Sequence, residues 1–179
     1  MAPPVHLSLL ARKVATSTGE ATYIAGWLRG EVVVLSNFPG QHSVRVEDLR
    51  IGTVGDAHAR ASGKALLAFL PKEVRDEYLE RHPRTRRTPN TIVDRKKLDE
   101  EFERVRQQGY ALDEEEFAEG ICCISVTLDR GASPFVLSIA APKDRFLKNR
   151  SEYVRAMLEA SNEASWSVDI GASRTPAAS

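Results

Sequence analysis

The chain has 179 residues, of which 42% are hydrophobic and 28% charged, the profile of one soluble globular domain. Its 25 basic and 25 acidic residues balance, so it lacks the net positive charge that favours nucleic acid or an anionic membrane surface. No apolar run approaches the roughly 20 residues of a membrane span, and the N-terminus does not resemble a signal peptide. The adjacent Cys122 and Cys123 would rarely pair, which fits a reducing cytoplasm.

A helix and a hairpin are predicted in the first part of the chain. Apolar residues at helical spacing over Val5–Val14 indicate an amphipathic helix. Ala21–Leu28 and Glu31–Asn37 are rich in Tyr, Ile and Val, and only Arg29-Gly30 separates them, which predicts two strands joined by a tight turn. Val44–Ile51 is a weaker candidate for a third strand, because it carries several charges.

Helices dominate the middle and the end of the chain. We expect them over Gly63–Leu70, over Lys72–Glu80, from Asp94 to Gly109, and over Lys148–Glu163. Ser62 and Asp94 are candidate N-caps, and Gly109 is placed to end its helix in a left-handed conformation. Residues 1–170 then form one domain, and the small, polar residues 171–179 form a disordered tail.

Two strands between residues 121 and 140 each carry a bulky apolar side and a side of small residues. Alternation places on the apolar sides Cys122, Ile124, Val126, Leu128, Phe135, Leu137 and Ile139. The other sides carry Cys123, Ser125, Ser138 and Ala140, whose short side chains suit either a small polar ligand or a covering helix. Together with the hairpin and helices, these strands predict an antiparallel sheet with helices packed on it, an α+β domain.

Two motifs carry a resemblance to a known family. RIGTVGDAHARASGKALLAFL (residues 50–70) and GYALDEEEFAEGICCISVTLDRGASPFVLSIAAP (residues 109–142) resemble the C-terminal effector-binding domain of the IclR family of bacterial transcriptional regulators. The resemblance covers nearly the whole chain. It implies about six antiparallel strands in a profilin-like or GAF-like arrangement, and a domain that senses a small molecule, in our expectation a small organic acid.

The resemblance also implies which residues bind the effector. Carried over by motif, they are Ala61, Ser62, Asp113, Cys123, Ser138 and Ala140. Ala140 stands where many relatives carry a second hydroxyl group. Arg60 stands where the family usually has a small Ser or Thr, and its guanidinium could pair with a ligand carboxylate or point to solvent. The acidic residues after Asp113 are expected to form a solvated bend.

Other kinds of site are weaker alternatives. His58, Asp113 and Cys123 lack the short paired spacing of structural zinc sites, so we expect no metal and no cofactor, and a hydrogen-bonded His58 at a helix entry. Cys123 with His58 as base would make a cysteine hydrolase, but no hydrolase signature surrounds GICCIS, so we do not expect an enzyme. The arginine-rich segment RHPRTRRTP fits an exposed loop better than a nucleic-acid contact. A GAF-like module of another signalling protein remains a second alternative.

The resemblance implies partners as well. Complete family members carry a winged helix-turn-helix ahead of the first helix, and no segment before Val5 could hold one, so DNA binding would belong to a part missing from this chain. The family pattern implies a homodimer or a tetramer, weakly supported by Trp27 and Phe38 as candidate exposed apolar residues. We expect a cytoplasmic protein that does not bind membranes.

Overall fold

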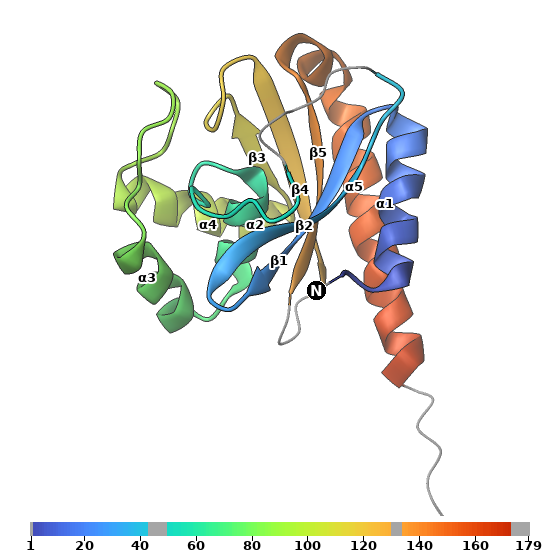
Figure 1. The fold of residues 1–179 in the computed structure, drawn as a ribbon, viewed down its shortest axis with the longest axis horizontal. Coiled ribbons are helices and arrows are strands. Elements are labelled where there is room, and N and C mark those ends of the chain that lie inside the picture. Colours follow the sequence, from blue (N-terminus) through green and yellow to red (C-terminus); the bar gives the residue numbers. More distant parts are fainter. Residues whose placement is uncertain (1, 43–49, 130–133, 173–179) are drawn as a thin grey trace, which may run out of the picture.

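Antiparallel strands form one sheet at the centre of the molecule (Figure 1). The computed structural model describes residues 2–42, 50–129 and 134–172. The strands lie in the order β2-β1-β5-β4-β3, and each neighbouring pair is antiparallel. Their bounds are β1 Ala21–Leu28, β2 Glu31–Phe38, β3 Ala111–Glu114, β4 Ile121–Asp129 and β5 Phe135–Pro142. The predicted α+β class is confirmed. About six strands were expected and the described residues form five, while the candidate strand Val44–Ile51 lies mostly outside those residues.

The hairpin between β1 and β2 forms where the sequence predicts it. Arg29 and Gly30 have φ angles of 52° and 79°. A two-residue type I′ turn needs positive φ at both positions, and such a turn matches the twist of the flanking strands. Leu28 pairs directly with Glu31 across the turn.

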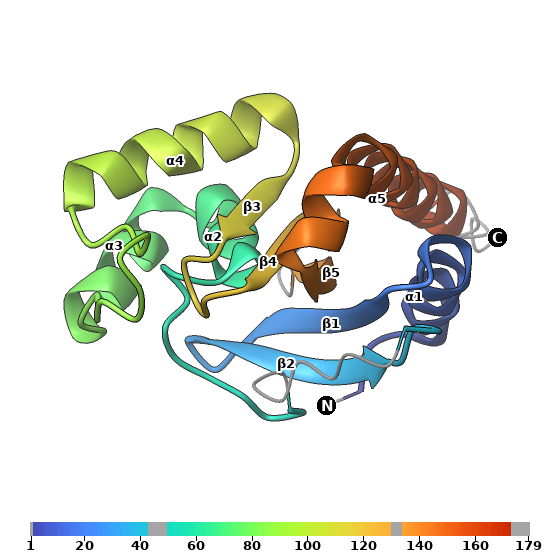
Figure 2. The same ribbon diagram turned by 90° about the horizontal axis from the view of Figure 1, so that it is seen from above.

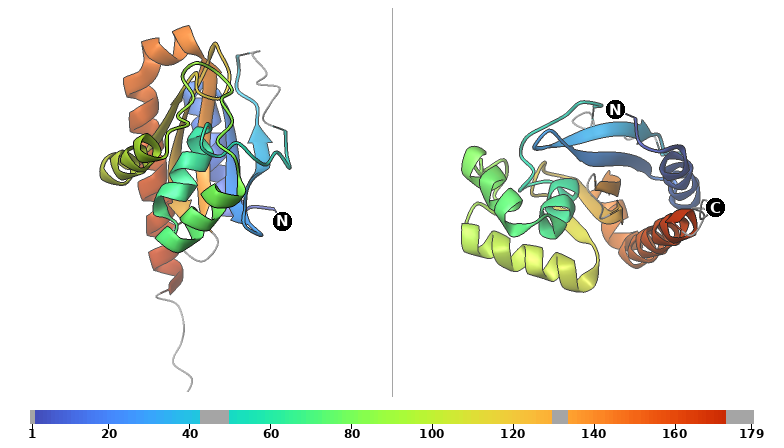
Figure 3. Two further views of the ribbon diagram at one scale, coloured as in Figure 1. Left: turned by 90° about the vertical axis from the view of Figure 1, so that its left-hand side faces the viewer. Right: turned by 90° about the horizontal axis from the view of Figure 1, so that it is seen from below.

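Helices cover both faces of the sheet. The bounds of the helices are α1 Val5–Thr18, α2 Ala61–Phe69, α3 Lys72–Arg81, α4 Arg95–Gln108 and α5 Lys143–Ala172. Helices α2, α3 and α4 lie on one side of the sheet and α1 and α5 on the other, which gives three layers (Figures 2 and 3). Among the described residues, no helix is long and apolar enough to cross a membrane.

The predicted helix ends are confirmed in the middle of the chain. The Asp94 side chain accepts a hydrogen bond from Lys97 N–H at 2.9 Å. Gly109 ends α4 in the left-handed region, at φ 86°. The predicted cap of α2 is wrong, because the helix begins at Ala61 with Arg60 at the N-cap, and the Ser62 side chain makes no capping bond.

The last helix is longer than the predicted Lys148–Glu163. It begins at Lys143, because Phe146 continues the buried stripe formed by Tyr153 and Met157. The predicted tail over residues 171–179 begins inside this helix. Residues 173–179 lie outside the described part, so the disordered tail stays a prediction.

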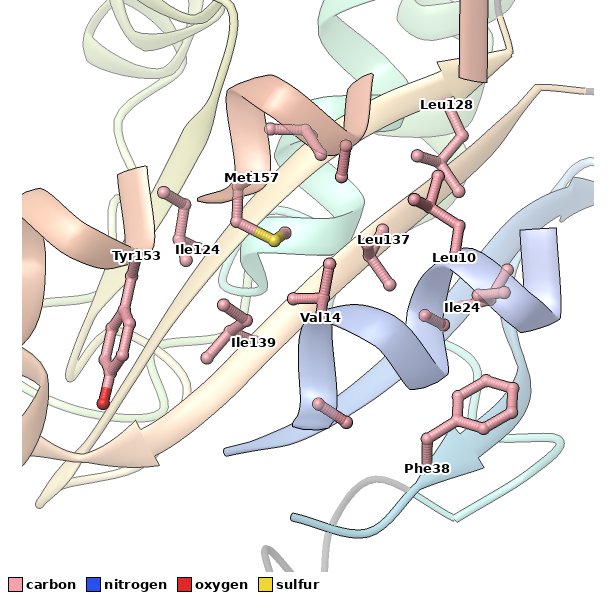
Figure 4. Close-up of a cluster of buried hydrophobic side chains, with 14 of the residues drawn as sticks. Leu10, Val14, Ile24, Phe38, Ile124, Leu128, Leu137, Ile139, Tyr153 and Met157 are labelled. Atoms are coloured by element: carbon pink, nitrogen blue, oxygen red, sulfur yellow. The ribbon is translucent and has the colours of Figure 1, made fainter. Parts of the chain in front are cut away.

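The main hydrophobic core lies between the sheet and the helices α1 and α5 (Figure 4). The apolar sides assigned from alternation all belong to it: Cys122, Ile124, Val126, Leu128, Phe135, Leu137 and Ile139. At its edge, Arg145 donates hydrogen bonds to both carboxylate oxygens of the buried Glu20, and the Tyr153 hydroxyl donates to the same carboxylate at 2.6 Å. The layer between this face of the sheet and the two helices is therefore apolar, and the carboxylate at its edge is fully hydrogen-bonded by Arg145 and Tyr153.

Phe38 and Trp27 are less exposed than the sequence suggests. Phe38 belongs to the main core at 7% exposure, with the guanidinium of Arg12 5.3 Å from its ring centroid. Trp27 is half-buried and meets the Tyr78 ring edge-on at 5.6 Å. The weak sequence support for self-association from exposed aromatic residues is therefore wrong.

Candidate functional site

Helix α2 begins tightly against the loop that precedes it. A Cβ at Gly63 would lie 2.1 Å from the backbone oxygen of Ala57, so only glycine fits there. Regular helical bonding starts at Lys64, whose N–H donates to Arg60 O at 3.0 Å. The N–H groups of residues 61–63 consequently have no partner within the helix. The helix start therefore presents backbone donors and the positive end of the helix dipole.

A row of hydroxyl groups crosses the sheet on the side that faces α2. Tyr23 of β1 pairs with Ser138 of β5, and Ser138 pairs with Ser125 of β4. The hydroxyl oxygens of Ser125 and Ser138 lie 2.5 Å apart, so one donates to the other. All three side chains are buried, at 2% exposure or less.

A second row joins three of the predicted site residues. Ala140 of β5 pairs with Cys123 of β4, which pairs with Asp113 of β3. Ala61, at the start of α2, packs in one buried cluster with Tyr23, Cys123 and Ala140. The predicted residues thus lie together at the contact between α2 and the sheet, whereas their role in binding stays a prediction.

Tyr23 belongs to this site but was missed in the sequence. Burial raises the pKa of its phenol well above the usual value, the nearby Cys123 adds to the rise, and the hydroxyl groups of Ser138 and Ser62 oppose it. Ser62 Oγ is itself fully buried and has no hydrogen-bond partner of acceptable geometry. The sequence did contain a signal: Tyr23 lies between Ala21 and Ala25 on one side of β1, and Ile24 points to the other side.

Arg60 points into the protein and away from solvent. The residue is 1% exposed, and Nη2 donates to the backbone oxygen of Val32 at 3.1 Å. Its Nε and Nη1 atoms are buried without a partner among the described residues. Burial lowers the pKa of this guanidinium, with partial compensation from Tyr23 and Tyr78.

Asp113 is buried and bound to its own turn. One carboxylate oxygen accepts from Glu116 N–H at 2.7 Å and from Phe117 N–H at 3.2 Å. Burial and the charge of Glu116 raise the pKa of Asp113 to about 7, while Lys64 and the two backbone donors act in the opposite direction. The carboxyl therefore shapes the turn between β3 and β4.

Glu116 corrects the expectation of a solvated acidic bend. Glu114 is exposed, but Glu116 is buried and accepts from Lys64 Nζ at 2.8 and 2.9 Å. Lys64 also donates to Glu101 of α4 at 3.2 Å, and its own side chain is 0% exposed. No sequence pattern pointed to this network, because the segment GKALLA is typical of an apolar helix whose single lysine is exposed to solvent.

The cysteines and His58 do not form a reactive pair. Burial, with a contribution from Asp113, raises the pKa of the Cys123 thiol well above its usual value, so the thiol stays protonated at neutral pH. His58 is 3% exposed, and its Nε2 lies 2.9 Å from the backbone oxygen of Thr85, which confirms the predicted hydrogen-bonded histidine. No group of three His, Cys, Asp or Glu residues that could hold a metal ion occurs in the described ranges.

Two arginines of the loop after α3 make hydrogen bonds to other parts of the domain. Arg84 donates to Val93 O at 2.8 Å. Arg87 pairs with Asp56 at 2.9 Å, donates to Phe117 O, and lies 3.9 Å from the Phe117 ring centroid. Through Arg87, the loop contacts Asp56 in the segment before α2 and Phe117 in the turn after β3. These contacts agree with its interpretation as a connecting loop.

Residues 6–166 match the model of the family described as bacterial transcriptional regulator IclR, C-terminal. The chain belongs to this family. Its fold is that of the IclR effector-binding domain, as the resemblance of the two motifs implied.

Several transcriptional regulators are similar to this chain in sequence. The chain is 35% identical over 150 residues to the transcriptional regulator KdgR of Dickeya chrysanthemi, covering 82% of this chain and 48% of that protein. It is 38% identical over 96 residues to the p-hydroxybenzoate hydroxylase transcriptional activator of Acinetobacter baylyi, covering 52% of this chain and 35% of that protein. The chain thus spans about half the length of the first of these relatives.

Solved IclR-type structures have the same fold. Thermotoga maritima IclR superposes with a TM-score of 0.82 at 30% identity, over 90% of this chain and 67% of that one. The inducer-binding domain of the Acinetobacter transcription factor PobR, a double mutant in complex with 3-hydroxybenzoic acid, gives a TM-score of 0.76 at 26% identity, over 91% and 97% of the two chains.

Proposed function

We propose that this domain senses a small organic acid that binds between the start of α2 and the small-residue face of the sheet. The observation that carries the proposal is the hydroxyl of Ser62, which is fully buried beside Tyr23 and Ser138 and makes no hydrogen bond of acceptable geometry within the described residues. A buried polar group left unpaired costs about 1–3 kcal/mol. A polar ligand in this layer would remove that cost.

The start of α2 favours an acid as the ligand. The N–H groups of residues 61–63 have no helical partner, and the dipole of the helix favours negative charge at this end. The related PobR domain has been solved with a small aromatic acid bound. The ligand-binding set we propose is Arg60, Ala61, Ser62, Asp113, Cys123, Ser138 and Ala140, with Tyr23 added from the structure.

In the whole regulator, ligand binding would act by population shift. A ligand that prefers one arrangement of associated copies favours that arrangement by its differential affinity. DNA binding would then belong to a separate segment of a cytoplasmic homodimer or tetramer. The match to the transcriptional regulator KdgR of Dickeya chrysanthemi covers 48% of that protein, which supports that division of roles.

Sensing without catalysis is the better interpretation of Cys123. A nucleophilic cysteine needs a lowered pKa or an adjacent base. Burial instead raises the pKa of the Cys123 thiol. Nε2 of His58 lies within hydrogen-bond distance of the backbone oxygen of Thr85. We therefore propose that the domain is not an enzyme.

Calorimetric titration with a panel of small organic acids tests the proposal. We expect at least one acid to bind the wild-type domain and to raise its melting temperature. Ser138→Ala and Ser62→Ala should each weaken that acid about tenfold, because each removes one hydrogen-bonding group from the site.

Ser17→Ala is the matched control, since Ser17 is an exposed hydroxyl on α1 that bonds only to the backbone of its own helix. It should bind the acid like the wild type. Failure of every acid to bind, or rapid labelling of Cys123 together with ester cleavage, would contradict the proposal.

A further inference from the structure

We infer that Arg60 makes the effector site selective for a carboxylate, and that the acid group of the effector binds at the end of the site near the β1–β2 hairpin, away from Asp113. The inference rests on the proposed function, because it assumes that the ligand enters the layer between α2 and the sheet. It adds the residue that selects for the acid group of the ligand and the orientation of that group in the site.

Arg60 carries donors that the described part of the chain leaves unused. A guanidinium has five N–H donors on three nitrogens. Nη2 donates to Val32 O at 3.1 Å, whereas Nε and Nη1 are buried with no partner. Nη2 retains a second hydrogen, so it can form a two-pronged contact together with a neighbouring nitrogen. A carboxylate is the group that matches this geometry.

No acidic side chain of the described residues neutralises Arg60. Asp56 is the acidic side chain that acts on Arg60, and its carboxylate pairs with Arg87 at 2.9 Å. A charged group at 1% exposure without a counter-ion is costly, because desolvation is not offset by a pair. The counter-ion of Arg60 therefore lies outside the described residues, and we assign this role to the carboxylate of the ligand.

The surroundings of Arg60 locate the acid group. The side chain starts at the N-cap of α2 and reaches β2, beside the phenols of Tyr23 and Tyr78. The Tyr78 hydroxyl is also buried without a partner of acceptable geometry, and its ring stacks on His82 at 3.9 Å. The unpartnered nitrogens of Arg60 thus lie near two phenols on the β2 side of the site.

Asp113 occupies the other end of the site and disfavours an anion there. Its carboxylate is already used by the N–H groups of Glu116 and Phe117. Asp113 lies on β3, whereas Arg60 contacts Val32 of β2, and the strands β1, β5 and β4 lie between these two edge strands. An acid entering this layer would consequently direct its carboxylate to Arg60.

Matched pairs of ligands that differ only in charge test this inference. Propionate, benzoate and 3-hydroxybenzoate are each titrated beside their primary amides into the wild type, Arg60→Met and Arg75→Met. In the wild type, we expect the acid to bind about 10- to 100-fold more tightly than its amide, the range for a hydrogen bond to a charged group. Arg60→Met should lose this preference and keep its affinity for the amide within about threefold.

Arg75→Met is the matched control, because Arg75 is likewise a buried arginine with an unpartnered Nε but lies on α3 over the ring of Phe102. It should retain the preference for the acid. If Arg60→Met does not fold, as judged by circular dichroism, Arg60→Lys replaces it and should retain only a reduced preference, since lysine lacks the planar fork.

The outcomes separate the two proposals. If the wild type binds acid and amide equally, or if the Arg60 variant that folds keeps the full preference, the site binds small molecules but the inference about Arg60 is wrong. If no acid or amide binds the wild type, the proposed function fails and the inference fails with it.

Discussion

Lys64 and Arg60 are buried cations about one turn apart on α2, and they differ in whether they have an anionic partner. Lys64 Nζ lies 2.8 Å from Glu116 and 3.2 Å from Glu101. Within the described ranges, the Arg60 side chain has only the backbone oxygen of Val32 as a hydrogen-bond partner. A paired cation of this kind fixes neighbouring elements to one another, whereas an unpartnered one costs stability and leaves its donors available to a ligand.

The two regions also differ in what they connect. Lys64 joins α2 to α4 through Glu101 and to the turn after β3 through Glu116. Arg60 spans from α2 to the hairpin strand β2. The Lys64 region therefore holds α2 in place, so that the donors of the Arg60 region are preorganised over the sheet.

Removing Lys64 should give the largest effect. Lys64→Met leaves Glu116 as a buried carboxylate without its cation, and Glu101 keeps only its pair with Arg104, so we expect a loss of about 3–5 kcal/mol in the free energy of unfolding. Urea denaturation of the ligand-free domain measures it. Lys13→Met is the control, because the Lys13–Glu163 pair is exposed, at 67% and 54%, and should contribute little. If Lys64→Met and Lys13→Met lose equal free energy of unfolding, the buried pairs of Lys64 do not hold the fold together more than an exposed pair does.

The pH dependence of stability should report on Asp113, the third charged group near Lys64. The pKa of Asp113 is about 7 in the folded domain, against an ordinary value of 3.8. The folded state holds its proton more tightly, so wild-type stability should fall as the pH rises from about 4 to about 7 and then level off.

Asp113→Asn keeps an acceptor for the turn and removes the ionisation. Relative to the wild type, we expect the variant to gain roughly 2–4 kcal/mol at pH 8, at about 1.4 kcal/mol per unit of pKa shift, and to gain almost nothing at pH 4. Urea denaturation at several pH values gives the difference. A difference independent of pH would mean that Asp113 is not the group whose ionisation is suppressed by burial and by Glu116.

Sequence patterns predicted the parts of this fold that depend on local chemistry. Arg29-Gly30 marked the hairpin, Asp94 and Gly109 marked the ends of α4, and alternation separated Cys122 from Cys123. In each case, the deciding interaction lies within a few residues of the pattern. The predicted cap at Ser62 was wrong because the packing of Ala57 against Gly63 sets where α2 begins.

The charged part of the site could not be predicted in the same way. Lys64 meets carboxylates 37 and 52 positions away in the chain, and Arg60 reaches a carbonyl 28 positions away. No local pattern encodes such contacts, because they exist only once α2 has packed on the sheet. The resemblance to a family pointed to the face of the sheet that α2 covers, but the packing of α2 on that face decides which of its two cations is paired with a carboxylate.

Arg60→Met should give the smallest effect and the opposite sign to Lys64→Met. Removing an uncompensated buried charge is favourable, but Val32 O then loses its donor, so we expect a net gain on the order of 1 kcal/mol in the ligand-free domain. Arg75→Met should instead lose stability, because the Arg75 guanidinium lies 5.3 Å from the Phe102 ring centroid and contributes a cation–π contact. Urea denaturation of both variants decides the sign. A loss for Arg60→Met as large as that for Lys64→Met would show that Arg60 is satisfied within the chain, and would leave it without capacity for a carboxylate.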